Sequence, residues 1–342
     1  MNLATDGRRW TQIMRFLSVS VCVHLWPILA AQEFPQAEIS NGQIKAKLYL
    51  PDADKGYYRA TRFDWSGVIP TLEFKGHTYF GQWFEKYDPK IHDAIIGPVE
   101  EFLTNNLPLG YDEAKPGGTF VRIGVGVLRK PAQDPQNKRF FTYDIVDPGK
   151  WAIHKTADTV EFEQAVADPS TGYAYVYRKS VHLTKGKPEM VLEHALKNTG
   201  RREIQTDVYN HNFFVIDGQP TGRDVSVQFP FELQAKVSLG SFAEVRGSKL
   251  VFLRDFVKGD RVQSDLTGFG PSPKDYDIRV ENQKTGAGVH VTGDRPLSRV
   301  LFWAINTVFA PEAYVSMNIA PGQEFKWRIA YEFYTLDERK AP

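Results

Sequence analysis

The sequence of 342 residues has one cysteine and almost no surplus of charge of either sign. Cys22 lies in an apolar stretch near the start, so the chain beyond that stretch can form no disulfide and offers no thiol for catalysis. The 42 Lys and Arg residues against 41 Asp and Glu residues leave a net charge of +1. This balance argues against a nucleic-acid-binding protein, which needs a basic surplus on one face. We therefore expect a large hydrophobic core alone to stabilise the fold.

Long hydrophobic runs are missing from most of the chain. No segment after residue 31 approaches 18 apolar residues, so the sequence predicts no transmembrane helix there. Near the start, Arg8, Arg9 and Arg15 precede an apolar stretch that ends in Ala30-Ala31. A basic start, a short apolar stretch and small residues before a cleavage point are typical of a secretion signal. We expect residues 1–31 to be removed and the protein to be periplasmic or secreted; an uncleaved anchor is the alternative.

Helical periodicity is also scarce, since only Ile95–Leu103 could form a helical turn or two. Short alternating or β-branched runs dominate instead. The expected strands lie within Ala37–Leu50, Val160–Ala165, Tyr173–Thr184, Met190–Lys197, Ala235–Leu239, Leu250–Leu253, Tyr276–Asn282, Gly288–Val291 and Phe325–Tyr334. The expected hairpin turns are Asn41-Gly42, Lys75-Gly76, Lys185-Gly186, Thr199-Gly200, Thr285-Gly286 and Pro321-Gly322. The pattern predicts one all-β domain, a sandwich or barrel, over residues 32–336, followed by a disordered tail at 337–342.

One segment carries a more specific signal. Met190–Gly218, MVLEHALKNTGRREIQTDVYNHNFFVIDG, is typical of a strand ending at Asn198, a turn, and a second strand ending in Asn-His-Asn-Phe-Phe. It resembles the galactose mutarotase (aldose 1-epimerase) superfamily, in which such a strand carries the catalytic acid histidine. Further segments resemble the same superfamily in the same order along the chain: Ala60–Leu72, Thr285–Pro296 and Ile319–Phe333. The resemblance implies a single-domain β-supersandwich that acts on a sugar ring without a cofactor.

The resemblance also implies roles for individual residues. His211 matches the catalytic acid, and Arg62 stands where the superfamily has a sugar-contacting arginine. The superfamily's acidic segment before the last turn is absent, and Glu312 stands roughly in its place, so we expect it to be the base, on a loop. An acid and a base on opposite sides of a pyranose flank a gap of ~6–9 Å. We therefore expect His211 and a carboxylate, Glu312 as first choice and Glu101 as second, at strand ends along one rim of a concave cleft that Arg62 also lines.

The superfamily's first histidine lies in an Asn-x-x-His-Gly-Gly segment that this sequence lacks. The stretch from His77 to Lys130 takes its place in order. The candidates there to replace that histidine are His77, His92, Glu101, Arg122 and Lys130, and of these we expect His92, Glu101 and Arg122 to contact the substrate. Trp83 is the favoured residue for stacking on a sugar, because its surroundings are polar and bounded by glycine, whereas Trp303 in the run VLFWAI is typical of a core position.

Motifs for other chemistry are absent. The sequence has no His-x-His, no His-Glu-x-x-His, no cysteine cluster for zinc and no Gly-x-Ser-x-Gly, so we expect no zinc site and no serine hydrolase of that class. No metal ligand is predicted, and a calcium ion held by scattered carboxylates stays open. Three functions stay open: a sugar epimerase, which is favoured, a non-catalytic carbohydrate-binding protein, and a polysaccharide lyase. For a lyase, Arg62 and Arg122 could neutralise a uronate and Tyr79 could act as base. Each function implies a carbohydrate partner, and none implies a membrane after cleavage of the leader.

Overall fold

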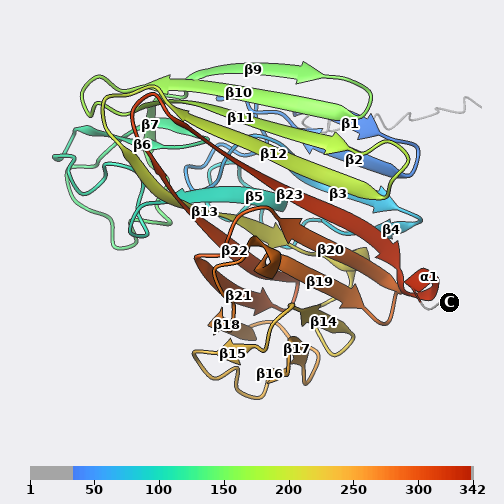
Figure 1. Ribbon diagram of the computed structural model, residues 1–342. Coiled ribbons are helices and arrows are strands. Elements are labelled where there is room, and N and C mark those ends of the chain that lie inside the picture. The colour runs from blue at the N-terminus through green and yellow to red at the C-terminus, as the bar shows by residue number, and fades with distance from the viewer. Residues whose placement is uncertain (1–33, 340–342) are drawn as a thin grey trace, which may run out of the picture. The chain divides into compact units, whose positions relative to one another are not determined.

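Antiparallel β-strands form nearly all of the regular structure between residues 34 and 339, the part of the chain that the computed structural model describes (Figure 1). The predicted secretion signal falls within residues 1–33, which lie outside the described part, as do residues 340–342. Two large sheets pack face to face, and two smaller sheets lie beside them. The arrangement confirms the all-β sandwich predicted from the sequence.

The larger sheet has ten strands and runs along one side of the sandwich. Its order is β16 (Ala243–Arg246), β17 (Lys249–Phe252), β14 (Val225–Gln228), β19 (Asp277–Asn282), β20 (Ala287–Gly293), β23 (Glu324–Thr335), β12 (Glu189–Asn198), β11 (Ala174–Leu183), β10 (Thr159–Ala167) and β9 (Lys150–Lys155). Side chains alternate between buried and exposed along β10 and β11, as expected for a sheet with one face in the core and one in solvent.

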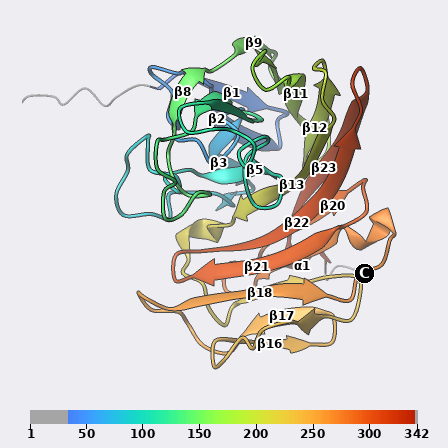
Figure 2. The same ribbon diagram turned by 90° about the vertical axis from the view of Figure 1, so that its left-hand side faces the viewer.

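The second large sheet has six strands, several of which are labelled in Figure 2. Its order is β15 (Gln234–Ala235), β18 (Arg261–Thr267), β21 (Arg299–Ile305), β22 (Val308–Ile319), β13 (Ile204–Phe213) and β5 (Gly97–Leu103). His211 lies on β13 and Glu312 on the adjacent strand β22. Glu312 therefore lies within a strand, and its predicted place on a loop is wrong.

The remaining elements are short. The smaller sheets contain β1 (Gln36–Ser40), β2 (Ile44–Tyr49), β3 (Val68–Phe74) and β4 (His77–Thr78), and β6 (Thr119–Arg122), β7 (Gly126–Arg129) and β8 (Asp144–Asp147). The helical elements are η1 (Ile216–Gly218), η2 (Pro273–Asp275) and α1 (Leu336–Arg339). Residues 337–339, which the sequence assigns to a disordered tail, lie in the helical turn α1. Of the expected strand Ala235–Leu239, only Ala235 lies in a strand.

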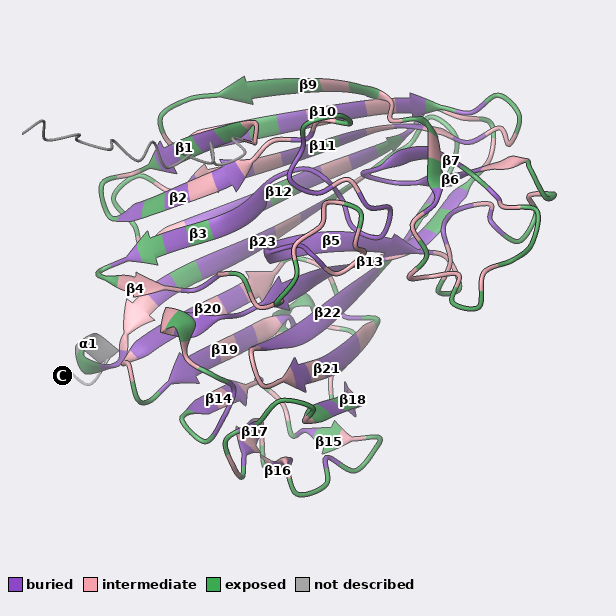
Figure 3. Cartoon of the chain, turned by 180° about the vertical axis from the view of Figure 1, so that it is seen from behind, coloured by how far each residue is buried: buried purple, intermediate pink, exposed green. Residues whose placement is uncertain are grey.

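Strand β5 lies where the sequence suggested a helical turn, so that prediction for Ile95–Leu103 is wrong. All residues of β5 are buried (Figure 3), which removes the alternation that normally identifies a strand. Its first residue, Gly97, has φ +85°, and a Cβ atom there would lie 2.7 Å from the carbonyl oxygen of Ile69. The close approach of two backbones therefore requires glycine at this position.

The core between the two large sheets is mainly aromatic and aliphatic. Tyr177 of β11 and Phe102 of β5 meet edge to face with ring centroids 5.4 Å apart. Nearby, the Tyr331 hydroxyl on β23 donates a hydrogen bond of 2.7 Å to Oδ1 of Asn212 on β13. Apolar burial of this kind is the main stabilising contribution in a chain without disulfides. The two contacts fix the orientation of β13 and β5 against the larger sheet.

A charged network crosses the same core. Lys179 of β11 and Glu100 of β5 are fully buried and form an ion pair. Glu100 also contacts Nε2 of His194 at 2.7 Å, and the Lys179 ammonium donates to the carbonyl oxygen of Ser66 at 2.9 Å. Burial opposes ionisation of Glu100, but Lys179 and His194 together hold its pKa at about 2. The network thus ties the six-stranded sheet to the ten-stranded one through paired charges.

Candidate active site

A small cavity of about 140 Å³ lies on the outer face of the six-stranded sheet; we call it the His211 pocket. Its lining residues are His211 and Phe213 of β13, Glu312 of β22, Leu301 and Trp303 of β21, Arg261 and Gln263 of β18, and Arg62, Trp83, Asp93, Arg139 and Phe140 from outside that sheet. The sheet supplies the floor, and segments before β5 and after β7 supply the walls.

Strand register places the two predicted catalytic groups together. The pairs Asn210–Ala313 and Phe214–Phe309 flank them, and the same register sets His211 opposite Glu312. His211 Nε2 lies 3.2 Å from Glu312 Oε1, and the side chains are 5% and 3% exposed. The predicted gap of a sugar's width between acid and base is therefore wrong, because adjacent strands hold the two groups in direct contact.

Burial brings both groups toward neutrality. It raises the pKa of Glu312 to about 7, although Arg62 and Arg139 oppose the shift. Burial, assisted by Arg62, holds the pKa of His211 well below its usual value. His211 Nδ1 is buried without a hydrogen-bond partner among residues 34–339, so the imidazole proton is better placed on Nε2, where it faces the Glu312 carboxylate. The pocket thus holds a proton acceptor and a proton donor side by side.

Arg62 lines the pocket, as predicted, and is held there by three partners. Its Nε donates to Glu101 at 3.0 Å, its Nη1 to Asp93, and its Nη2 to the Tyr209 hydroxyl at 3.2 Å. The guanidinium also lies over the ring of Phe63, 4.3 Å from the centroid. These contacts fix a planar donor at the wall of the pocket.

Glu101 and Arg122 lie behind the pocket rather than in it. Glu101 is fully buried and accepts hydrogen bonds from Arg62 and, through both of its oxygens, from Arg139 at 3.0 and 2.7 Å. Arg122 Nη1 lies 3.4 Å from Glu101 and donates to the carbonyl oxygen of Phe102 at 3.1 Å. Burial opposes ionisation, but the arginines hold the pKa of Glu101 well below its usual value. The expectation that Glu101 and Arg122 contact substrate is wrong. Glu101 positions the arginines that do line the pocket, and Arg122 contacts Glu101 from behind.

His92 is likewise outside the pocket lining, contrary to the prediction. It stacks on Phe140 with centroids 5.2 Å apart, and its Nε2 lies 3.1 Å from Asp93 Oδ2. It therefore supports two residues that do line the pocket. Of the other candidates from this stretch, His77 contacts Asp217, and Lys130 donates to the carbonyl oxygen of Tyr111.

Two tryptophans line the pocket in different ways. Trp83 stacks on Phe213 at 5.0 Å, and Phe213 stacks on His211 at 3.7 Å, so one face of the Trp83 ring is already covered. Trp303, predicted to be core, is only half-buried and meets His211 edge to face at 5.5 Å. Alternation along β21 explains the error, because Leu301 and Trp303 share the pocket face while Val300 points to the core.

Sequence analysis missed Asp93, Arg139, Phe140, Arg261 and Gln263. Arg261 and Gln263 are exposed on β18, with the buried Val262 between them, so strand alternation could have identified the pair. Asp93, Arg139 and Phe140 lie in segments outside the strands, where no periodic pattern marks a site.

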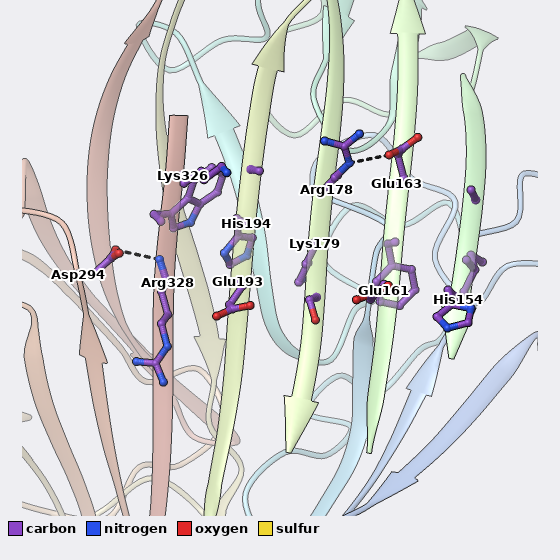
Figure 4. Close-up of a pocket in the computed structure, with 16 residues that line it drawn as sticks. His154, Glu161, Glu163, Arg178, Lys179, Glu193, His194, Asp294, Lys326 and Arg328 are labelled. Carbon is purple, nitrogen blue, oxygen red and sulfur yellow. Dashed lines mark hydrogen bonds and ion pairs between the residues drawn. The ribbon is translucent and has the colours of Figure 1, made fainter. Parts of the chain in front are cut away.

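A larger hollow of about 700 Å³ lies on the outer face of the ten-stranded sheet (Figure 4). The small side chains of Ala152, Ser180 and Ala195 lie among charged residues such as Glu163 and Arg178, which pair across β10 and β11. No predicted site residue lines this hollow. Within residues 34–339, no group of three or more His, Cys, Asp or Glu side chains is placed to hold a metal ion. In the same range, no helix has the length and apolar character needed to cross a membrane.

No family model and no curated protein matches the sequence. Solved structures do match the fold. An aldose epimerase homologue from C. elegans is 13% identical, with a TM-score of 0.55 over 88% of this chain and 99% of that one. A galactose mutarotase related enzyme from Lactobacillus acidophilus is 12% identical, with a TM-score of 0.53 over 88% and 98%. A galactose mutarotase-like protein from Lactobacillus casei is 12% identical, with a TM-score of 0.52 over 87% and 100%. The chain therefore has the galactose mutarotase-like β-sandwich fold that its sequence predicts.

Proposed function

We propose that the protein is an exported sugar epimerase that interconverts the anomers of a sugar by acid–base catalysis in the His211 pocket. The observation that carries this proposal is the contact of 3.2 Å between His211 Nε2 and Glu312 Oε1 inside a cavity of the fold. A carboxylate with a pKa of about 7 beside a neutral imidazole suits proton transfer near neutral pH.

The short distance between the two groups is compatible with this chemistry. The hydroxyl O1 and the ring oxygen O5 are both bonded to the anomeric carbon, so an acid and a base side by side can reach both. Glu312 takes the proton from O1 while Nε2 of His211 gives its proton to O5, and the bond between C1 and O5 breaks. The proton taken by Glu312 passes to Nε2 of His211, 3.2 Å away, so that no imidazolate remains. The aldehyde end rotates, and the reverse transfers close the ring with the other configuration. No proton is gained or lost overall.

The remaining pocket residues suit a sugar ligand. Arg139 and Asp93 offer a donor and an acceptor for hydroxyls, and the half-buried ring of Trp303 offers an apolar surface for C–H groups. The lyase alternative is disfavoured, because two of the three residues it needs, Arg122 and Tyr79, are buried and do not line the pocket. A binding protein without catalysis is the alternative that the experiment must separate.

Proton NMR exchange spectroscopy on freshly dissolved aldoses and uronic acids tests the proposal. We expect the protein to accelerate exchange between the α and β anomer signals of at least one sugar. If a sugar binds and its anomer exchange is not accelerated, the protein is a carbohydrate-binding protein without catalytic activity. A sugar panel without binding or exchange would contradict the assignment of the pocket.

A further inference from the structure

The charges around the His211 pocket point to the class of sugar. Resting on the proposed function, we propose that the pocket binds a uronic acid, a sugar with a carboxylate on its ring, and that Arg139 and Arg261 receive that carboxylate.

The pocket lies in a field of excess positive charge. Arg62, Arg139 and Arg261 line it, and Arg122 lies directly behind. Two carboxylates lie among these arginines, Asp93 and Glu101. Burial raises the pKa of each, but Arg62 lowers the pKa of Asp93, and Arg62 and Arg139 lower that of Glu101, so that both pKa values lie below their usual range. Four guanidiniums therefore face two fully ionised carboxylates, with Glu312 only partly ionised near neutral pH. A neutral sugar would leave this excess uncompensated, whereas a ligand carboxylate would offset it.

The arginines differ in how many of their N–H groups the protein already uses. Each nitrogen of Arg62 has a protein acceptor: Glu101, Asp93 or Tyr209. Arg139 uses Nε and Nη2 on Glu101 and Tyr209, and its Nη1 has no acceptor within residues 34–339.

Arg261 is the least engaged of the three. Its Nη2 donates to Gln263 Oε1 at 2.6 Å, and within the described range no carboxylate lies within 4 Å of its guanidinium. Arg139 and Arg261 therefore keep N–H groups free for a ligand, and a planar guanidinium matches a carboxylate with two parallel hydrogen bonds.

The size of the pocket favours a carboxylate bonded directly to the sugar ring. The acid–base pair and both free arginines line the same cavity of about 140 Å³. The anion must therefore lie within about one ring's width of the anomeric carbon. The carboxylate of a uronic acid meets this condition because it is attached to C5, whereas the phosphate of a hexose 6-phosphate extends further on a CH₂–O link.

A substrate comparison tests the inference directly. Galacturonate and glucuronate are compared with their neutral methyl esters, with galactose and glucose, and with the hexose 6-phosphates, by anomer exchange and by calorimetric binding. We expect the free uronate to exceed its methyl ester by about tenfold or more in kcat/KM or affinity, the range of a charge-assisted hydrogen-bonded pair. Equal values for acid and ester, or a preference for the 6-phosphates, would overturn the inference.

Substitution of Arg261 tests whether this residue binds the carboxylate of the uronic acid. Arg261→Gln should remove most of the preference for uronate over its methyl ester, and the fold should tolerate the substitution because Arg261 is exposed. Arg178→Gln, an exposed arginine on the ten-stranded sheet, is the matched control and should keep the preference. If the Arg261→Gln variant keeps the full preference for uronate over its methyl ester, Arg261 does not bind the ligand carboxylate.

The outcomes separate this inference from the proposed function. If the protein accelerates anomer exchange of neutral aldoses and shows no preference for uronates, the epimerase function is supported and the uronate inference is contradicted. If the protein binds uronates more tightly than their esters and does not accelerate anomer exchange, the uronate inference is supported and the epimerase function is contradicted.

Discussion

His211 Nε2 and Glu312 Oε1 lie 3.2 Å apart on adjacent strands, in direct contact. Strand pairing, rather than a flexible loop, sets this distance. The two groups are consequently held in place for the proton transfer that we propose, and their substitution should affect that reaction more than the fold of the surrounding sheet.

The pH dependence of the reaction should follow Glu312. Burial raises the pKa of this carboxyl to about 7, so the basic form is scarce below that pH and predominates above it. The pKa of His211 is lowered well below its usual value, so the imidazole stays neutral over the same range. We expect kcat/KM to rise as the pH increases through about 7. Initial exchange rates between pH 5 and 9 measure this, and a rate that falls over the same interval would be incompatible with Glu312 as base.

Glu101 should contribute strongly to stability although it does not line the pocket. Glu101→Gln leaves Arg62 and Arg139 without their buried counter-charge, which costs about 3–5 kcal/mol. Urea unfolding with an unchanged m-value measures the loss. Glu163→Gln, which removes an exposed partner of Arg178, should cost less than about 1 kcal/mol. If both variants lose a similarly small amount of unfolding free energy, burial of Arg62 and Arg139 does not depend on Glu101.

The buried pair between Lys179 and Glu100 can be tested with a double-mutant cycle. Lys179→Met leaves the Glu100 carboxylate without its cation and should lower the free energy of unfolding by about 3–5 kcal/mol. Adding Glu100→Gln removes the unpaired charge, so the double variant should be more stable than the sum of the two single losses indicates. Strictly additive losses would show that the two charges do not interact in the native core.

Much of the fold could be predicted, because alternating strands such as β10 and β11 have one face in solvent. The prediction failed at β5, which is buried on both faces and so lacks alternation. Two turns were placed correctly but given the wrong role. Thr199-Gly200 and Pro321-Gly322 connect strands of different sheets, β12 to β13 and β22 to β23, rather than closing hairpins. Sequence alone does not indicate when a chain passes from one sheet to the other.

The site could be predicted only in part. His211, Glu312, Arg62 and Trp83 line the pocket, as the sequence analysis proposed. His92, Glu101 and Arg122 lie behind or beside the pocket rather than in it. Glu101 does so because a carboxylate on a strand that is buried on both faces pairs with the nearest arginines. Arg139 comes from an irregular segment, where spacing along the chain carries no information on position in space.

Export is proposed on the sequence pattern of residues 1–31 alone. We expect the mature protein to begin within a few residues of Gln32, because Ala30-Ala31 supply the small residues that precede cleavage. N-terminal sequencing of the protein from the periplasm or medium measures this. A mature protein that retains residues 1–20 would contradict the proposal and favour an uncleaved anchor.

The most direct test of the catalytic assignment compares turnover and binding in His211→Asn and Glu312→Gln, with Glu193→Gln on the exposed face of β12 as control. We expect anomer exchange to fall by roughly 10²–10⁴-fold in both pocket variants, the usual contribution of a general acid or base, while affinity for the sugar changes much less. The control should keep the activity of the unmodified protein. Unchanged exchange in either pocket variant would contradict the proposal that this pair transfers the protons.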